Sequence, residues 1–120
     1  MEIKENINIE FKREFTAELK KEVVAFANTN EGTIYIGIDD FGNILGIENA
    51  DVVLNQVVQS IRNSIKPDVT IYCNSKIEKI ENKNVIVIQV QRGALRPYYI
   101  AEKGLKSSGV YVRQGSSSVP

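Results

Sequence analysis

Positions 85–90 of the chain are Val85-Ile86-Val87-Ile88-Gln89-Val90. Apolar side chains fall on both faces of this run, which is typical of a strand in the middle of a sheet. Residues 7–12 and 33–38 alternate apolar and polar side chains, so they predict half-buried strands of the same sheet. A turn cluster at 39–43 and apolar residues at 44–47 predict that the second of these strands returns in a β-hairpin.

Two stretches, residues 16–27 and 51–65, carry the apolar spacing of amphipathic helices. Pro67 ends the second, because the residue before a proline avoids helical geometry. Residues 69–72 and 77–80 predict either one bent strand or two, and short strands are predicted at 98–100 and 110–112. We therefore predict an α+β domain with two principal helices and a mixed, mostly antiparallel sheet of about six strands.

The length of 120 residues fits one compact domain, and a hydrophobic fraction of 42% is enough for one core. We expect this domain over residues 1–115. Residues 116–120, Ser116-Ser117-Ser118-Val119-Pro120, are expected to begin a linker to a further C-terminal region.

The residue types exclude several classes of protein. The chain has no histidine, so Ser–His and Cys–His nucleophile pairs and His-containing zinc sites are excluded. The lone cysteine, Cys73, forms no internal disulfide and suits a reducing cytosol. No apolar stretch approaches the roughly 20 residues of a membrane span, and no signal peptide opens the chain. We expect a cytoplasmic protein with no membrane partner.

Carboxylates form one candidate site: Glu5, Glu10 and the pair Asp39-Asp40. If the first two strands are neighbours, these side chains can converge and hold Mg²⁺ or Mn²⁺, which prefer oxygen ligands. Such a metal could activate water for phosphodiester cleavage without a histidine. The alternative is that both glutamates are solvated strand residues and the aspartates shape a turn.

Basic residues form the other candidate site. The chain has 15 Lys plus Arg against 15 Asp plus Glu, so any nucleic acid must be held by a local patch. Tyrosines at 98, 99 and 111 lie among the C-terminal cations and offer stacking faces. An ordinary mixed-charge surface is the competing interpretation. The candidate phosphate contacts are Lys12, Arg13, Arg92, Arg96, Lys103, Lys106 and Arg113.

Five motifs follow one another along the chain: Glu5-x4-Glu10-Phe11-Lys12, Ala25-Phe26-Ala27-Asn28-Thr29, residues 32–42 with Gly46, Arg96-Pro97-Tyr98-Tyr99, and residues 111–117. Together they resemble the Schlafen-type AlbA domain. In bacteria this domain is described as the DNA-binding part of transcriptional regulators, usually ahead of a winged-helix region. In some animal Schlafen proteins two such domains form a clamp that cuts structured RNA with two Glu and one Asp.

The resemblance implies a DNA-binding N-terminal domain of a transcriptional regulator. For such a domain we expect no catalytic residue and no cofactor. The alternative that it implies is a ribonuclease for structured RNA, using Mg or Mn on Glu5, Glu10 and Asp39 or Asp40. A second alternative is a sensor or oligomerisation module without a nucleic-acid ligand. For the DNA-binding interpretation, a homodimer would help because it presents two patches at once.

Overall fold

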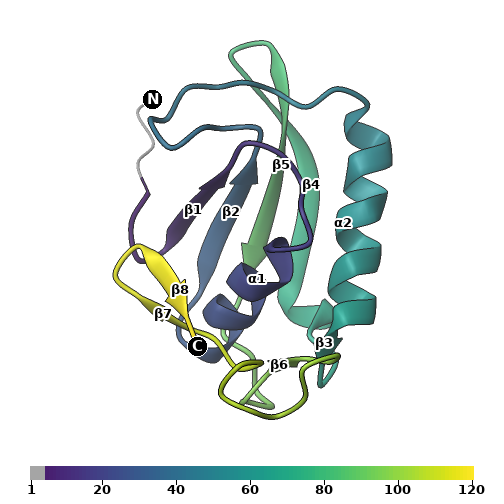
Figure 1. Cartoon of the computed structure of the whole chain (residues 1–120). Helices are drawn as coiled ribbons and strands as arrows, with labels where there is room; N and C mark the ends of the chain where they lie inside the picture. Colours follow the sequence, from purple (N-terminus) through teal and green to yellow (C-terminus); the bar gives the residue numbers. More distant parts are fainter. Residues whose placement is uncertain (1–4) are drawn as a thin grey trace.

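The structure is a computed structural model, and it describes residues 5–120 (Figure 1). It has two α-helices and several mostly antiparallel strands, which confirms the predicted α+β class. Residues 5–120 form eight strands against about six predicted, because two short pairs, β3–β6 and β7–β8, lie outside the main sheet. In chain order the elements are β1 (Ile9–Lys12), α1 (Leu19–Asn28), β2 (Gly32–Ile36), α2 (Ala50–Ser64), β3 (Ile65–Lys66), the 3-10 turn η1 (Thr70–Tyr72), β4 (Cys73–Ile80), β5 (Lys83–Val90), β6 (Tyr99–Ile100), β7 (Val112–Gln114) and β8 (Ser117–Val119).

The main sheet has the strand order β1-β2-β5-β4. β1 and β2 are parallel, and the other two pairs are antiparallel. β5 lies between β2 and β4, and its residues 85–88 are buried, as its two apolar faces predict. The start of β2 and the end of β5 lie at the same end of the sheet, because Gly32 is opposite Val90 in the antiparallel register.

The predicted β-hairpin at 33–47 is reduced to one bridge between Ile38 and Ile44. Gly37, Gly42 and Gly46 all have positive φ, so the segment turns repeatedly and does not run alongside β2. Ile47 N–H instead donates to the Asn84 carbonyl. At the other end of the chain, residues 117–119 form β8, which pairs with β7 where the sequence predicts the start of a linker.

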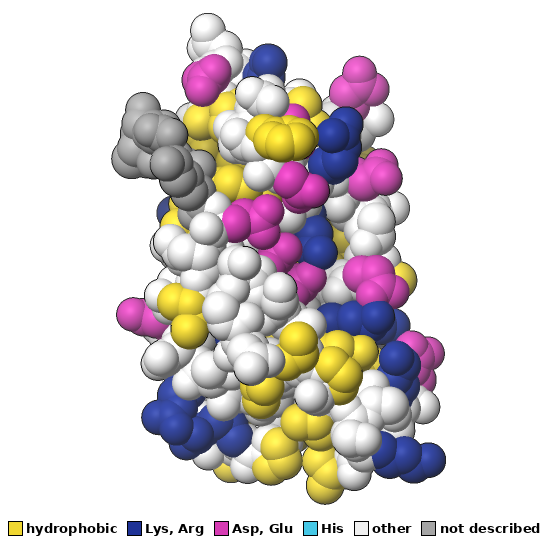
Figure 2. All heavy atoms as spheres, turned by 60° about the vertical axis from the view of Figure 1, so that its left-hand side comes forward, with side chains coloured by type: hydrophobic (Ala, Val, Ile, Leu, Met, Phe, Trp, Pro, Cys, Tyr) yellow, Lys and Arg dark blue, Asp and Glu magenta, His cyan; other side chains and the backbone are white. Residues whose placement is uncertain are grey.

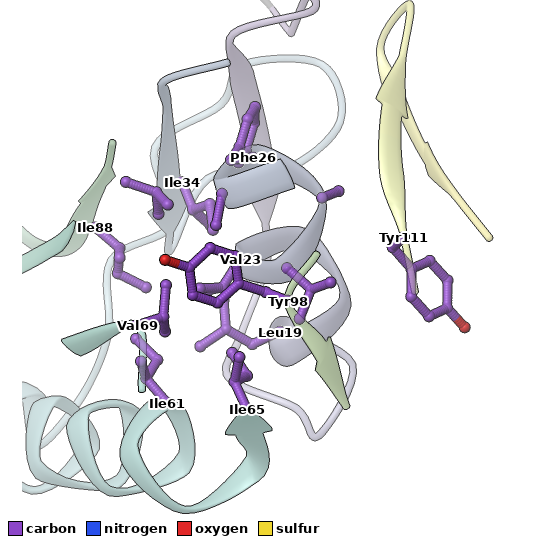
Figure 3. Close-up of a cluster of buried hydrophobic side chains, with 14 of the residues drawn as sticks. Leu19, Val23, Phe26, Ile34, Ile61, Ile65, Val69, Ile88, Tyr98 and Tyr111 are labelled. Carbon is purple, nitrogen blue, oxygen red and sulfur yellow. The ribbon is translucent and has the colours of Figure 1, made fainter. Parts of the chain in front are cut away.

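Both helices pack on one face of the sheet and form the main core. Leu19, Val23 and Phe26 from α1 meet Ile34 and Ile88 from the sheet, and Val57 and Ile61 join them from α2. Tyr98 lies in the middle of this cluster and is fully buried (Figure 3). A smaller cluster of Phe11, Ile38, Val85 and Val87 covers part of the other face.

Within residues 5–120, no helix is long and apolar enough to cross a membrane.

Candidate nucleic-acid interface

Asn28, the last residue of α1, fastens the C-terminal third of the chain to the helix. Its Nδ2 donates to the carbonyls of Tyr98 and Tyr111, both at 2.9 Å, and its Oδ1 accepts from Tyr98 N–H at 2.7 Å. The adjacent Thr29 Oγ1 accepts from Arg113 N–H at 2.9 Å. The Asn-Thr motif at 28–29 therefore has a structural role, because it satisfies backbone groups of two later segments.

Arg113 is buried, with 4% of its surface exposed, so its guanidinium does not face solvent as a phosphate contact would. Its Nη1 is 2.5 Å from Glu10 Oε1. Its other nitrogens donate to the carbonyls of residues 6, 7 and 9, and the guanidinium carbon lies 4.8 Å from the centre of the Phe26 ring. Arg113 therefore joins β7 to β1 across 103 positions of sequence.

Lys12 and Glu22 complete this buried charge network. Lys12 Nζ lies 2.7 Å from Glu22 Oε2 and 3.7 Å from Glu10 Oε2, and Glu22 is 3.8 Å from Arg113. Burial lowers the pKa of Lys12, but its hydrogen bond and charge interaction with Glu22 outweigh this and raise the pKa. Lys12 is thus engaged within the fold. The sequence analysis did not identify Glu22 as part of this network. The pattern that could have indicated it is an acidic residue directly before the buried apolar positions 23–27 of α1.

Glu5, Glu10 and Asp40 form one acidic corner of the molecule. Burial raises the pKa of Glu5 to about 7, and the negative charges of Glu10 and, less strongly, Asp40 contribute to the increase. Asp39 is directed elsewhere: its carboxylate accepts from Phe41 N–H, Asn43 N–H and Asn43 Nδ2. Those hydrogen bonds lower the pKa of Asp39. Asp39 therefore shapes its own turn, and Asp40 is the aspartate near the two glutamates.

The acidic corner has the donor type that Mg²⁺ or Mn²⁺ prefers, but its arrangement does not fit a metal ion. Among residues 5–120, no group of three or more His, Cys, Asp and Glu side chains is placed to hold one. Glu10 is already neutralised by Arg113 and lies near the ammonium of Lys12. The corner is therefore an acidic pair with a neighbouring aspartate.

The remaining candidate phosphate contacts divide between the two ends of the sheet. Arg92 follows β5 at the end where β2 begins, whereas Arg13 follows β1 at the end where β2 finishes. Arg92 and Arg96 lie on the loop between β5 and β6, and Lys103 and Lys106 lie on the loop between β6 and β7. Both loops lie at the lower end of Figure 1. We call these four residues, Arg92, Arg96, Lys103 and Lys106, the basic end.

Figure 2 shows this division on one face: dark-blue Lys and Arg side chains lie on both sides of the lower half, and a column of magenta carboxylates lies higher up. Arg92, Arg96 and Lys106 are exposed, and Lys103 is half-buried. Glu102 is the one acid between positions 91 and 120, and it pairs with Lys20 at 2.9 Å. The basic end therefore has a local excess of positive charge in a chain of zero net charge.

The loop that carries Arg92 and Arg96 is held in shape by the buried Tyr98. Gly93 lies against that ring so closely that a Cβ would be 2.2 Å from it, and Gly93 N–H donates to the carbonyl of Ala27 at 2.9 Å. The Tyr98 hydroxyl accepts from Leu95 N–H, and Arg96 Nε donates to the Gly93 carbonyl. The loop is thus fixed before any ligand arrives, with both arginines exposed.

A polar cleft of about 550 Å³ lies at the same end of the sheet as Arg92. It is lined by side chains that can donate and accept hydrogen bonds, and none of these was selected in the sequence analysis. Their sequence pattern indicates a binding site only weakly, because amides at exposed strand positions are common. The polar lining residues are Asn8, Glu31, Thr33, Gln89 and Gln91.

Comparison with known proteins agrees with the motifs. A family model described as Schlafen, AlbA_2 matches residues 4–120. No curated protein matches the sequence significantly. Among solved structures, the DIP2311 protein from Corynebacterium diphtheriae is similar, with a TM-score of 0.69 and 22% identity over 94% of this chain. This chain covers 22% of the length of that protein. The N-terminal domain of a RecG-related protein from Nitrosomonas europaea has a TM-score of 0.65 and 22% identity, covering 92% of this chain and 78% of that one.

Proposed function

The chain belongs to the Schlafen, AlbA_2 family, and on that premise we propose that it binds nucleic acid, with DNA as the partner, through the basic end. The observation that carries the proposal is the clustering of Arg92, Arg96, Lys103 and Lys106 on two neighbouring loops. The similar Nitrosomonas domain belongs to a protein named for its relation to the ATP-dependent DNA helicase RecG. We further propose that this domain serves as the DNA-binding part of a cytoplasmic transcriptional regulator.

The charges of the basic end suit phosphate recognition. Arginine guanidinium groups donate to two phosphate oxygens at once, and lysine ammonium groups add charge at less defined geometry. The amides of the polar cleft, Gln89 and Gln91, lie next to Arg92 in sequence and can hydrogen-bond base edges. Phosphate contacts would then set the position of the nucleic acid, and the amides would supply selectivity.

The test is fluorescence anisotropy of labelled duplex DNA and a labelled RNA hairpin, with the full chain and two variants. Arg92→Glu/Arg96→Glu reverses two charges at the basic end and should weaken DNA binding at least about tenfold. Arg13→Glu reverses one charge at the opposite end of the sheet and is the matched control, which should bind like the wild type. Equal loss in both variants, or none in either, would show that the basic end is not the binding surface. Absence of wild-type binding to both ligands would favour a sensor or oligomerisation module.

A ribonuclease is the second candidate, and one observation favours it: Glu5 lies near Glu10 and Asp40, and burial, together with the negative charges of these two residues, raises the pKa of Glu5 to about 7. The engagement of Glu10 by Arg113 argues against it. The test is cleavage of an RNA hairpin in Mn²⁺, compared between the wild type and Glu5→Gln/Asp40→Asn. Cleavage by the wild type that is lost in the variant, with RNA binding retained, would establish the enzyme. Equal cleavage by both proteins would indicate a contaminating nuclease.

A further inference from the structure

β4 forms an open edge of the main sheet. It is eight residues long and pairs with β5 on one side. No other strand of the described part of the chain pairs with it. α2 packs on the face of the sheet, where Ile61 of the helix and Ile77 of the strand belong to the main core. An edge of this length offers a row of backbone groups to another strand.

The contacts at the two ends of β4 determine which of its residues form backbone hydrogen bonds with β5. Gln91 N–H donates to the Tyr72 carbonyl at 2.8 Å just before the strand. At the far end, Glu81 and Asn82 both have positive φ, 51° and 65°, as in the two-residue turn that closes a hydrogen-bonded pair. Since hydrogen-bonded and non-hydrogen-bonded pairs alternate, residues 74, 76, 78 and 80 direct their backbone groups to β5.

The intervening residues, Ser75, Ile77 and Lys79, therefore direct their N–H and C=O groups outward. Within residues 5–120, these groups have no hydrogen-bond partner. Because Ile77 is central among them, a second strand running antiparallel would pair most fully when its own Ile77 lies opposite. About six backbone hydrogen bonds would then form across the edge.

In that register, the charged side chains on either side of Ile77 face opposite charges on the second copy. Lys76 and Glu78 are both exposed, and their partners on β5 are Val87 and Val85 of the smaller cluster, so both point to the face without helices. In an antiparallel pair centred on Ile77, Lys76 of each copy lies opposite Glu78 of the other. These are non-hydrogen-bonded positions, where facing Cα atoms approach to about 4.5 Å and side chains are closest.

We propose that two copies of this chain associate through β4, in antiparallel register centred on Ile77, with two reciprocal Lys76–Glu78 ion pairs. The strand order would be continuous, from β1 of one copy through both β4 strands to β1 of the other. Because the dyad reverses the strand direction, the two basic ends lie at opposite ends of the joined sheet. The interface is small, so the dimer forms at micromolar or higher protein concentration. This inference does not depend on the proposed nucleic-acid binding.

The experiment is sedimentation velocity of the full chain from about 10 to 500 µM, with single charge reversals and their mixture. The wild type should shift from monomer to dimer over this range. Lys76→Glu places a glutamate opposite each Glu78, and Glu78→Lys places a lysine opposite each Lys76, so each variant alone should weaken dimerisation at least about tenfold. An equimolar mixture of the two should dimerise again, because both cross-strand pairs regain opposite charges.

Lys79→Glu is the matched control: it reverses a charge on the same strand, but its expected cross-strand neighbour is the uncharged Ser75, so it should dimerise like the wild type. All three substituted residues are exposed on an edge strand, and far-UV circular dichroism of each variant verifies the fold. A wild type that stays monomeric to 500 µM would overturn the proposal. So would a dimer that persists in both single variants, or a mixture that fails to recover.

Discussion

Replacing Arg113 with methionine should destabilise the fold more than any substitution at the basic end. The guanidinium is buried against Phe26, and it provides the closest positive charge to Glu10. Methionine keeps much of the side-chain volume but none of the charge or the five hydrogen bonds. Glu10 would then be left buried with only Lys12 nearby, 3.7 Å away.

The magnitude follows from the cost of breaking a buried pair by removing one partner, which is about 3–5 kcal/mol. For a domain of this size, that loss should lower the Tm by roughly 10–20 °C. The exposed Arg92→Met is the matched control and should change the free energy of unfolding by no more than about 0.5 kcal/mol.

Urea unfolding followed by circular dichroism measures both variants, and Glu10→Gln completes a double-mutant cycle. We expect the double variant Glu10→Gln/Arg113→Met to be more stable than the sum of the single losses predicts, by about 1–3 kcal/mol, because no unpaired charge remains. A loss below about 1 kcal/mol for Arg113→Met, or an additive cycle, would refute the assignment of Arg113 to the interior.

Three further predictions concern the same fold. Asn28→Ala removes three hydrogen bonds and should cost about 2–4 kcal/mol, with early loss of amide protection in residues 98–114 by hydrogen exchange. Gly93→Ala places a Cβ 2.2 Å from the Tyr98 ring and should lower the Tm and weaken DNA binding together. Glu5 has a pKa of about 7 when folded against an ordinary value of 4.5, so the folded state binds more protons and the wild type loses stability as the pH rises from about 4.5 to 7. Glu5→Gln should therefore be more stable than the wild type by about 1 kcal/mol at pH 8, after allowance for solvent screening, with no gain at pH 4 in urea unfolding.

Local patterns predicted the sheet and helices because burial leaves a direct trace in sequence. The run at 85–90 is apolar on both faces, and β5 is an interior strand of the sheet. The same logic identified both helices, although α1 begins at Leu19 and not at Thr16. The hairpin predicted at 33–47 forms only beside its turn, with a bridge between Ile38 and Ile44, because three glycines at positive φ turn the chain away from β2.

Contacts between side chains far apart in the chain left no comparable pattern in the sequence. In the sequence Val112-Arg113-Gln114, the arginine resembles any exposed cation, and its partner Glu10 lies 103 positions away. The choice between Asp39 and Asp40 depends on which carboxylate accepts from the backbone of its own turn, which only the coordinates resolve. The motifs that suggest a functional site at Glu10, Lys12 and Arg113 thus build the network that closes the domain.

The salt dependence of DNA binding tests the central claim most directly. For the wild type, the logarithm of the binding constant should fall against the logarithm of salt concentration with a slope of about −3 to −4, since four cations at the basic end contact phosphate. Arg92→Gln/Arg96→Gln should reduce that slope by about two, and Arg13→Gln should leave it unchanged. A slope that is the same in all three proteins would contradict the account.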